Sequence, residues 1–322
     1  MIKYSVIGTS WITKSFIEGA SLCPELFLDG ICSRKRERGE EFKNDVGAQR
    51  VFTSVEELAA SDTELVYIAS PNSCHYEQTR LLLEHKKHVI CEKPATVTAA
   101  EFRELCVLAE KKGVVYFEAI MYMHSPERAV FKRGVGELGN IHSATIDFSQ
   151  LSSKYPALLR GENPNIFNPE MKTGALNDLG IYCVYPVVDL FGMPDEIIPC
   201  QHFLSTGADG SGSAAFVYKD KLVTIVYSKV GQSRSPSQIM GDKGTLAVES
   251  ISKLCSAELY NNNGEKTLLI PDIEKKILMG NEAKSAVDFI LRPEESGSFL
   301  KECQEMNEKV LLCMEKMRVR NA

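Results

Sequence analysis

The sequence lacks the features that mark several classes of protein. Its ten cysteines form no CxxC pair and its six histidines form no ligand array, so we predict no metal site. No apolar run approaches the length of a membrane span, and residues 1–16 lack the apolar core and cleavage site of a signal peptide. The cysteines are therefore expected to be buried free thiols, and the protein to lie in a reducing cytoplasm.

An excess of positive charge is also missing. Lysine and arginine number 37 against 43 aspartates and glutamates, a net charge of −6 that is spread along the chain. This balance argues against nucleic-acid and membrane partners. The 322 residues are 44% hydrophobic, which is enough for roughly two globular domains at about 150 residues each.

The first 120 residues alternate short apolar strands with helical patterns. The expected strands are residues 4–7, 30–32, 65–69, 88–91 and 114–117, and the expected helices include residues 54–58, 77–85 and 99–112. Such alternation is typical of right-handed βαβ units. We therefore predict an α/β fold that begins with a Rossmann doubly wound parallel sheet, whose ligand binds beyond the carboxyl ends of the strands.

The pattern changes after about residue 141. Residues 142–148, 213–218, 222–228 and 244–249 alternate apolar and polar side chains and predict an open, mostly antiparallel sheet in a second, α+β domain. An apolar helical block covers residues 176–191, and Pro186 within it predicts a kink or a break. Residues 281–317 predict one or two amphipathic helices over the core. We expect the first domain to span residues 1–121 and the second to span residues 122–322. The carboxyl-terminal helix is expected to pack back on the first domain.

The first strand runs into Gly8, Thr9, Ser10, Trp11 and Ile12, where a dinucleotide fold places its phosphate-binding turn. Gly8 can make the tight turn, but Ser10 replaces the second glycine of the usual fingerprint and Thr13 the third. Small hydroxyl side chains can bind phosphate, so these five residues are candidates for cofactor binding. The alternative is an ordinary turn from strand to helix.

The end of the second strand bears on which nicotinamide cofactor is used. A carboxylate there would favour NAD, whereas the chain continues with Ser33, Arg34 and Lys35. A hydroxyl followed by cations suits a 2′-phosphate, so we predict NADP(H) as the preferred cofactor and NAD as the other option. Arg36 and Arg38 are interpreted as the solvated start of the next helix.

Three further segments carry a family resemblance. They are VYIASPNSCH at residues 66–75 with HVICEKP at 88–94, GALNDLGIY at 174–182 and IMGDKGTL at 239–246. Together they resemble the glucose-fructose oxidoreductase, inositol dehydrogenase and MocA family over essentially the whole chain. The EKP segment is the most specific part, and the altered turn at Gly8 is the clearest departure.

The resemblance implies hydride transfer between NAD(P) and a hydroxyl-bearing carbon of a sugar, polyol or cyclic diol. It also implies that Lys93 points at the reacting hydroxyl, with Asp178 and Tyr182 completing the catalytic set. Tyrosine at position 182 resembles the dihydrodiol dehydrogenase branch and points away from the inositol dehydrogenases, which tend to carry histidine.

The chemistry of these side chains agrees with such roles. Alcohol oxidation needs a group that takes the hydroxyl proton, and Tyr182 can do so if a nearby ammonium such as Lys93 favours the phenolate. Asp178, four residues before Tyr182, would share its helical face and hold the lysine or the substrate. The structural alternatives are a helix N-cap for the aspartate and a core position for the tyrosine.

The turns after the buried strands supply the remaining candidates for cofactor binding. By resemblance, Ser70, Pro71 and Asn72 lie along the nicotinamide ribose, and Glu92 contacts that ribose or orients its neighbours. His75 is equally consistent with a cofactor contact and with a helix-start histidine that is hydrogen-bonded to the backbone.

Two other functions remain compatible with the sequence. One is a non-catalytic dinucleotide sensor of the same fold, and the other is an enzyme with tightly bound, recycled NAD. The substrate itself depends on loops such as residues 150–172. By resemblance, we expect a homodimer or a dimer of dimers formed through the open face of the second sheet.

Overall fold

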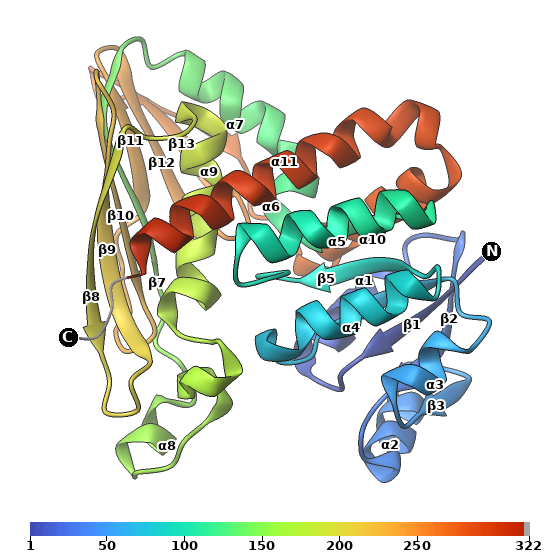
Figure 1. Ribbon diagram of the computed structural model, residues 1–322. Helices are drawn as coiled ribbons and strands as arrows, with labels where there is room; N and C mark the ends of the chain where they lie inside the picture. Colours follow the sequence, from blue (N-terminus) through green and yellow to red (C-terminus); the bar gives the residue numbers. More distant parts are fainter. Residues whose placement is uncertain (319–322) are drawn as a thin grey trace. The chain divides into compact units, whose positions relative to one another are not determined.

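The computed structural model describes residues 1–318 and divides the chain into two compact units (Figure 1). Unit 1 is formed by residues 1–124 and 274–308. Unit 2 is formed by residues 125–273 and the chain from residue 309. None of the helices in the described part of the chain combines the length and apolarity that a membrane crossing requires.

Unit 1 is built on a six-stranded sheet in which every pairing is parallel, in the order β3-β2-β1-β4-β5-β6. The strands are β1 (Ile2–Ile7), β2 (Leu26–Cys32), β3 (Arg50–Phe52), β4 (Leu65–Ile68), β5 (His88–Glu92) and β6 (Tyr116–Ala119). This order reverses between β1 and β4, as in Rossmann folds. The predicted doubly wound sheet is confirmed, and β3 is the strand that the sequence patterns did not reveal.

The helices of unit 1 begin and end at recognisable signals. They are α1 (Trp11–Ala20), α2 (Arg36–Val46), α3 (Val55–Ala59), α4 (Asn72–Glu84), α5 (Ala99–Lys112), α6 (Met121–His124), α10 (Lys275–Leu291) and the greater part of α11 (Pro293–Met317). Helix α5, for example, starts with a capping box between Thr98 and Glu101 and ends at Gly113 in the left-handed conformation.

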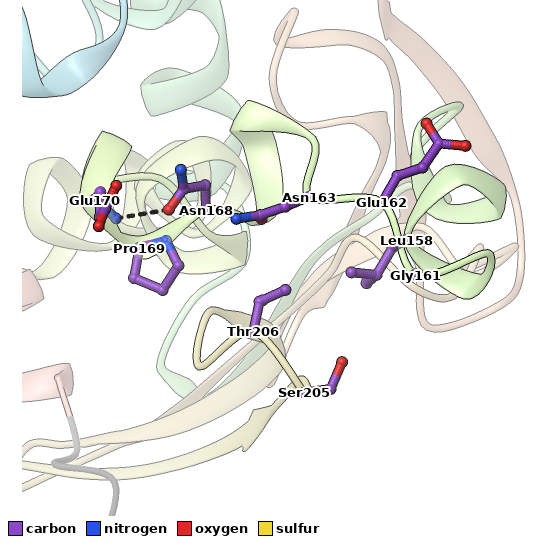
Figure 2. A pocket seen from close by; sticks show the side chains of 9 residues that line it. All are labelled: Leu158, Gly161, Glu162, Asn163, Asn168, Pro169, Glu170, Ser205 and Thr206. Carbon is purple, nitrogen blue, oxygen red and sulfur yellow. Dashed lines mark hydrogen bonds between the residues drawn. The ribbon is translucent and has the colours of Figure 1, made fainter.

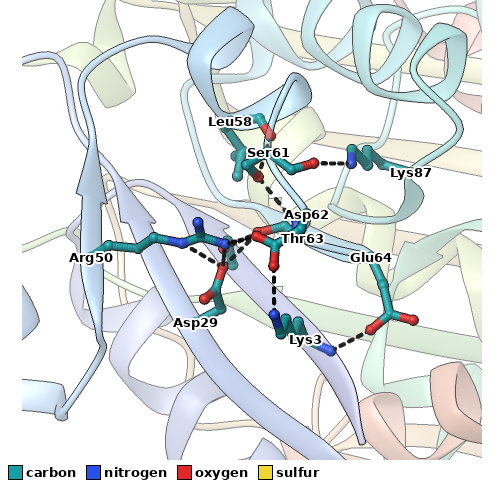
Figure 3. A network of polar contacts seen from close by, with 10 residues as sticks. Lys3, Asp29, Arg50, Leu58, Ser61, Asp62, Thr63, Glu64 and Lys87 are labelled. Carbon is teal, nitrogen blue, oxygen red and sulfur yellow. Dashed lines mark hydrogen bonds and ion pairs between the residues drawn. The ribbon is translucent and has the colours of Figure 1, made fainter.

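A polar network fastens the strands of this sheet together at the edge opposite the predicted ligand site (Figure 3). Asp29 is the extra residue of a β-bulge between β1 and β2, and it is only 5% exposed. Its carboxylate accepts hydrogen bonds from Arg50 Nε at 2.9 Å and from Thr63 Oγ1 at 2.8 Å. Because a buried carboxylate is costly without partners, Arg50 and Thr63 tie β3 and the start of β4 to β2.

Unit 2 contains an eight-stranded sheet in the order β14-β13-β12-β11-β7-β10-β9-β8. Its strands are β7 (Ile141–Ser149), β8 (Glu196–Phe203), β9 (Asp209–Val217), β10 (Leu222–Ser228), β11 (Ser237–Gly241), β12 (Gly244–Ser250), β13 (Cys255–Asn261) and β14 (Lys266–Ile270). All pairings are antiparallel except that of β7 with β10. The predicted open, mostly antiparallel sheet is confirmed.

The helical segments of unit 2 are short apart from two. They are α7 (Glu127–Gly136), α8 (Tyr155–Leu159), η1 (Asn165–Phe167), η2 (Pro169–Met171), η3 (Leu176–Gly180), α9 (Ile181–Phe191) and the end of α11. The break expected at Pro186 is wrong, since α9 continues through this residue. The irregularity lies earlier, where η3 is a π-helix that leads directly into α9.

Candidate functional site

The turn after β1 depends on Gly8. Its φ of +108° is rarely adopted by other residues, and a Cβ atom there would lie 2.7 Å from the carbonyl oxygen of Ala69, which follows β4. The backbones that leave β1 and β4 therefore approach each other where the order of the strands reverses. Ligands of open α/β sheets bind at this crevice.

The start of α1 offers an uncompensated positive end. Ser10 occupies the N-cap position but makes no side-chain hydrogen bond to the helix backbone, and its hydroxyl lies 3.2 Å from that of Thr13. The first turn contains no acidic residue. Trp11 begins the helix with 70% of its surface exposed, and Ile12 is half-buried. The turn from Gly8 to Ile12 can thus receive an anionic group.

Two arginines follow β2, Arg34 shortly after the strand and Arg38 in the first turn of α2. Arg34 is exposed, and the neighbouring Ser33 hydroxyl donates to the Lys35 carbonyl at 3.0 Å. Arg38 is exposed in the first turn of α2, as interpreted from the sequence, and its guanidinium also donates to Thr9 Oγ1 at 2.7 Å and to Thr9 O at 3.3 Å. The adjacency of β1 and β2 brings the start of α2 to the glycine turn, which the sequence pattern of α2 alone does not show.

His75 connects the loops that follow β4 and β5. The ring is 1% exposed, and its Nδ1 and Nε2 atoms each lie 2.9 Å from a carbonyl oxygen, that of Pro94 and that of Ser70. Burial lowers the pKa of His75, while the two carbonyls oppose this shift. His75 was interpreted either as a cofactor contact or as a histidine that is hydrogen-bonded to the backbone. The structure shows the hydrogen bonding to the backbone. His75 therefore holds Ser70 and Pro94 in place.

The neighbouring cofactor candidates lie on the same loop. Pro71 is the N-cap residue of α4, and Asn72 is its first helical residue. The Ser70 hydroxyl donates to Gln78 Oε1 at 2.7 Å. All three are half-buried at the carboxyl edge of the sheet.

The end of β5 carries Glu92 and Lys93, both half-buried. Glu92 accepts hydrogen bonds from the Tyr67 hydroxyl and, at 3.2 Å, from the Lys93 backbone. Burial raises the pKa of the Glu92 carboxyl, and the Lys93 charge opposes this. With both oxygens engaged, Glu92 is suited to orienting its neighbours. Tyr67 was not expected at this site because it reads as an ordinary core residue of β4.

A second unexpected residue is Lys275, the first residue of α10. Its Nζ atom lies 3.8 Å from the centroid of the Trp11 ring. The two residues are far apart in sequence, and no motif surrounds Lys275, so sequence patterns could not reveal this contact.

The two other catalytic candidates belong to unit 2. Asp178 lies in the π-helix η3 and forms an ion pair with Lys229, which directly follows β10 and is 7% exposed. The sequence suggested Lys93 or the substrate as its partner and did not suggest Lys229. Tyr182 is the second residue of α9 and is half-buried, with its ring 5.5 Å from that of Phe148 in an edge-on arrangement.

The helix that carries these residues is fixed at its start by Asp209. The Asp209 carboxylate accepts a hydrogen bond of 2.6 Å from the backbone N–H of Leu176. Gly174, two residues earlier, has φ +128°, and a Cβ atom there would lie 1.9 Å from Asp209 Oδ1. Gly174, the first glycine of GALNDLGIY, is thus required by this cap.

A shallow polar cavity of about 500 Å³ lies elsewhere in unit 2 (Figure 2). Its lining residues come from α8 and the loop after it, from η2 and its N-cap, and from the turn between β8 and β9, and they are Leu158, Gly161, Glu162, Asn163, Asn168, Pro169, Glu170, Ser205 and Thr206. Amide, carboxylate and hydroxyl groups of this kind bind hydroxylated molecules. None of the three catalytic candidates lines it.

Comparison with known proteins places the whole chain among oxidoreductases. Residues 2–120 match the family described as "Oxidoreductase family, NAD-binding Rossmann fold", and residues 134–247 match the "GFO/IDH/MocA C-terminal domain". The chain is 36% identical over 292 residues to scyllo-inositol 2-dehydrogenase (NADP(+)) of Bacillus subtilis, covering 90% of this chain and 88% of the relative.

A more distant relative and a solved structure also match most of the chain. Trans-1,2-dihydrobenzene-1,2-diol dehydrogenase of Macaca fuscata fuscata is 26% identical over 88% of this chain and 84% of its own. The crystal structure of a 3-ketoreductase from Actinomadura kijaniata, in complex with TDP-benzene and NADP, superposes with a TM-score of 0.83. It covers 98% of this chain and 96% of that chain at 19% identity, which shows the shared fold.

We predict that Gly174→Ala destabilises unit 2 by about 2 kcal/mol or more, because the methyl group would displace the Asp209 cap and the backbone would be strained. Chemical denaturation monitored by circular dichroism measures this loss. Gly161→Ala is the matched control, since Gly161 also has positive φ (+85°) but nothing lies within 4 Å of its added Cβ. Equal losses in both variants would contradict the role of the cap.

Proposed function

Because the chain belongs to the Gfo/Idh/MocA family of oxidoreductases, with its NAD-binding Rossmann fold, we propose that it is an NADP(H)-dependent dehydrogenase of polyols. Cyclic polyols of the inositol type are the first substrate class, with sugars and cyclic diols next. The observation that carries the proposal is Lys93 at the carboxyl end of β5, in a chain 36% identical to an NADP-dependent inositol dehydrogenase.

The residues of unit 1 fit a dinucleotide. Gly8 lets the backbone of the turn pass close to Ala69, and the start of α1 is free of acidic side chains. These features suit a pyrophosphate group. We propose that the nicotinamide ribose lies where β4 and β5 end. The residues at these two ends are Ser70, Pro71, Asn72 and Glu92. His75 would act on this site indirectly, by holding its two loops.

The preference for NADP(H) follows from the end of β2. Ser33 and Arg34 replace the carboxylate that would accept the ribose hydroxyls of NAD and repel a 2′-phosphate. Arg38 adds a second guanidinium against Thr9. A planar cation with several N–H donors matches a phosphate group well. We therefore assign Arg34 to the 2′-phosphate and Arg38 to the shape of the turn.

When bound, NADP(H) would supply the hydride chemistry of the proposed reaction at the substrate carbon. The chain must then take up or return the hydroxyl proton. Lys93 and Tyr182 are the proposed proton-handling residues, since an amine and a phenol can each exchange a proton with an alcohol. Asp178, paired with Lys229, would fix the helical segment that presents Tyr182.

The identity of residue 182 does not decide between the substrate classes. Tyrosine at this position suggested the dihydrodiol dehydrogenases, yet the inositol dehydrogenase relative is 36% identical and the dihydrodiol relative 26%. Both act on a ring that carries neighbouring hydroxyl groups, as their names state. A cyclic vicinal diol is the chemistry that the two substrates share, and we propose it as the group that is oxidised.

The outer face of the sheet in unit 2 supports a proposal of dimerisation. Ile198 on β8 is 54% exposed, and the register continues this row through Ala215 on β9 and Thr224 on β10. Leu222, at the start of β10, is 48% exposed. Exposed apolar and small side chains on a flat sheet favour self-association.

The first prediction concerns turnover. With NADP+ and a panel of inositols, cyclic diols and pentoses, the purified protein should form NADPH, followed by its absorbance. Lys93→Met and Tyr182→Phe should each lower kcat by about 100-fold or more, the usual contribution of a proton-transfer group. Lys111→Met on the exposed surface of α5 and Tyr76→Phe on α4 are the matched controls.

Two outcomes would contradict this function. Nucleotide binding without turnover of any substrate would favour the sensor. Conversion of a substrate with nucleotide that stays bound and no net reduction would favour the recycled-NAD enzyme.

The cofactor preference gives a separate prediction. The protein should bind NADPH more tightly than NADH, and Arg34→Ala should weaken NADPH binding by about tenfold while leaving NADH unchanged, because only NADPH has the 2′-phosphate. Calorimetric titration measures both affinities. Arg36→Ala is the control, since Arg36 is exposed and lies 4.0 Å from Glu40. Equal binding of the two cofactors by the unmodified protein would refute the preference.

For dimerisation, sedimentation equilibrium should give twice the mass of the chain, or four times for a dimer of dimers. Ile198→Asp should shift the protein toward the monomer, because a charge would have to be buried in the interface. Leu159→Asp, at a residue that is 69% exposed outside the sheet, should not. A monomeric unmodified protein would rule out this proposal.

A further inference from the structure

We propose that Lys275 binds the pyrophosphate of the dinucleotide and that Trp11 holds its ammonium group beside the glycine turn until the cofactor arrives. This inference rests on the proposed use of NADP(H) and adds a binding residue from a helix about 260 residues away in sequence. It starts from one contact, the 3.8 Å between Lys275 Nζ and the centroid of the Trp11 ring.

The contact is fixed by the packing of two helices of unit 1. Helices α1 and α10 meet at Gly19 and Gly280, where a Cβ atom on Gly19 would lie 2.6 Å from the Gly280 nitrogen. A Cβ atom on Gly280 would in turn lie 3.2 Å from the Gly19 carbonyl oxygen. Such close backbone packing leaves no room for α10 to shift along α1. Lys275 is therefore placed at the start of α1 by the fold.

The indole contacts the Lys275 ammonium and does not itself neutralise it. A cation above an aromatic face is attracted by the ring quadrupole, whereas a carboxylate would neutralise it. Neither α1 nor α10 has an acidic residue in its first turn, although Glu274 is the N-cap residue of α10 and the charge of Lys275 acts on the Glu92 and Glu282 carboxyls. A lysine at a helix N-terminus is unfavourable because both are positive. The arrangement therefore places a cation against Trp11 at the start of α1, where the helix N-terminus also favours an anion.

The charge of Lys275 also reaches the end of β5. It acts on the Glu92 carboxyl, where it opposes the burial that raises the pKa of this group. The ammonium thus contacts Trp11 at the turn after β1 and acts electrostatically on the end of β5. A dinucleotide crosses this interval, with its pyrophosphate at the turn and its nicotinamide beyond it. The pyrophosphate is the anion that lies within this interval, whereas the 2′-phosphate is proposed to lie at Arg34.

The test compares the affinities of NADPH and NADH for variants of the full-length protein by calorimetric titration. Lys275→Met keeps the apolar stem but removes the charge, and it should weaken both nucleotides by a similar factor of about tenfold, since both contain the pyrophosphate. Lys275→Arg should retain most of the affinity. Lys276→Met removes an exposed charge from the next position of the same helix and should change little.

Thermal unfolding of each variant checks that a loss of nucleotide affinity does not come from a loss of folded protein. Trp11 is the only tryptophan, so its fluorescence gives a second readout with inorganic pyrophosphate as the probe. Pyrophosphate should change the emission of the unmodified protein, as the ammonium leaves the ring, and should not change that of Lys275→Met.

The outcomes separate this inference from the function on which it rests. If the unmodified protein binds neither nucleotide, the proposed cofactor is wrong. If the protein binds both and Lys275→Met binds them equally well, Lys275 does not contact the phosphates. A loss confined to NADPH would assign Lys275 to the 2′-phosphate and would likewise overturn the proposal.

Discussion

The carboxyl edge of the sheet in unit 1, where we propose that the cofactor binds, depends on one buried imidazole. His75 lies 2.9 Å from the carbonyl oxygens of Ser70 and Pro94, so it joins the loop after β4 to the loop after β5. A neutral imidazole carries a single N–H and can donate to only one of these two carbonyls at a time. The doubly protonated ring would donate to both, but burial disfavours that form. The position of Lys93, next to Pro94, therefore follows from a histidine that itself need not touch the cofactor.

The sequence predicted the fold where strands are apolar on both faces. Strands β4 and β5 were predicted because parallel buried strands appear as continuous apolar runs. Strand β3 has three residues and begins with Arg50, so it has no such run and becomes a strand only because β2 lies beside it. Of the kink or break expected at Pro186, the break does not occur. The missing N–H of this proline affects one carbonyl, that of Tyr182, and a buried apolar helix tolerates the loss.

For the site, the family, the Rossmann fold and the oxidoreductase class predicted from the EKP and GALNDLGIY segments are confirmed. Local motifs could reveal residues that follow a strand, such as Glu92 and Lys93. They could not reveal side chains that arrive from elsewhere in the chain, such as Lys229 and Lys275, because only packing brings these near. The individual roles of the site residues, the dimer and the cytoplasmic location stay predictions.

The altered glycine fingerprint has a steric explanation at the positions of its first and third glycines. Gly8 is kept because a Cβ atom would collide with Ala69, and no other residue could relieve that contact. The third glycine usually allows close packing around the first helix. Here Thr13 is fully buried in that position, and its hydroxyl pairs with Ser10, so a small polar side chain fits the space. Further along the same helix, Gly19 makes a different close backbone contact, against Gly280 of α10. This contact fixes the start of α10, and with it Lys275, beside Trp11 at the start of α1.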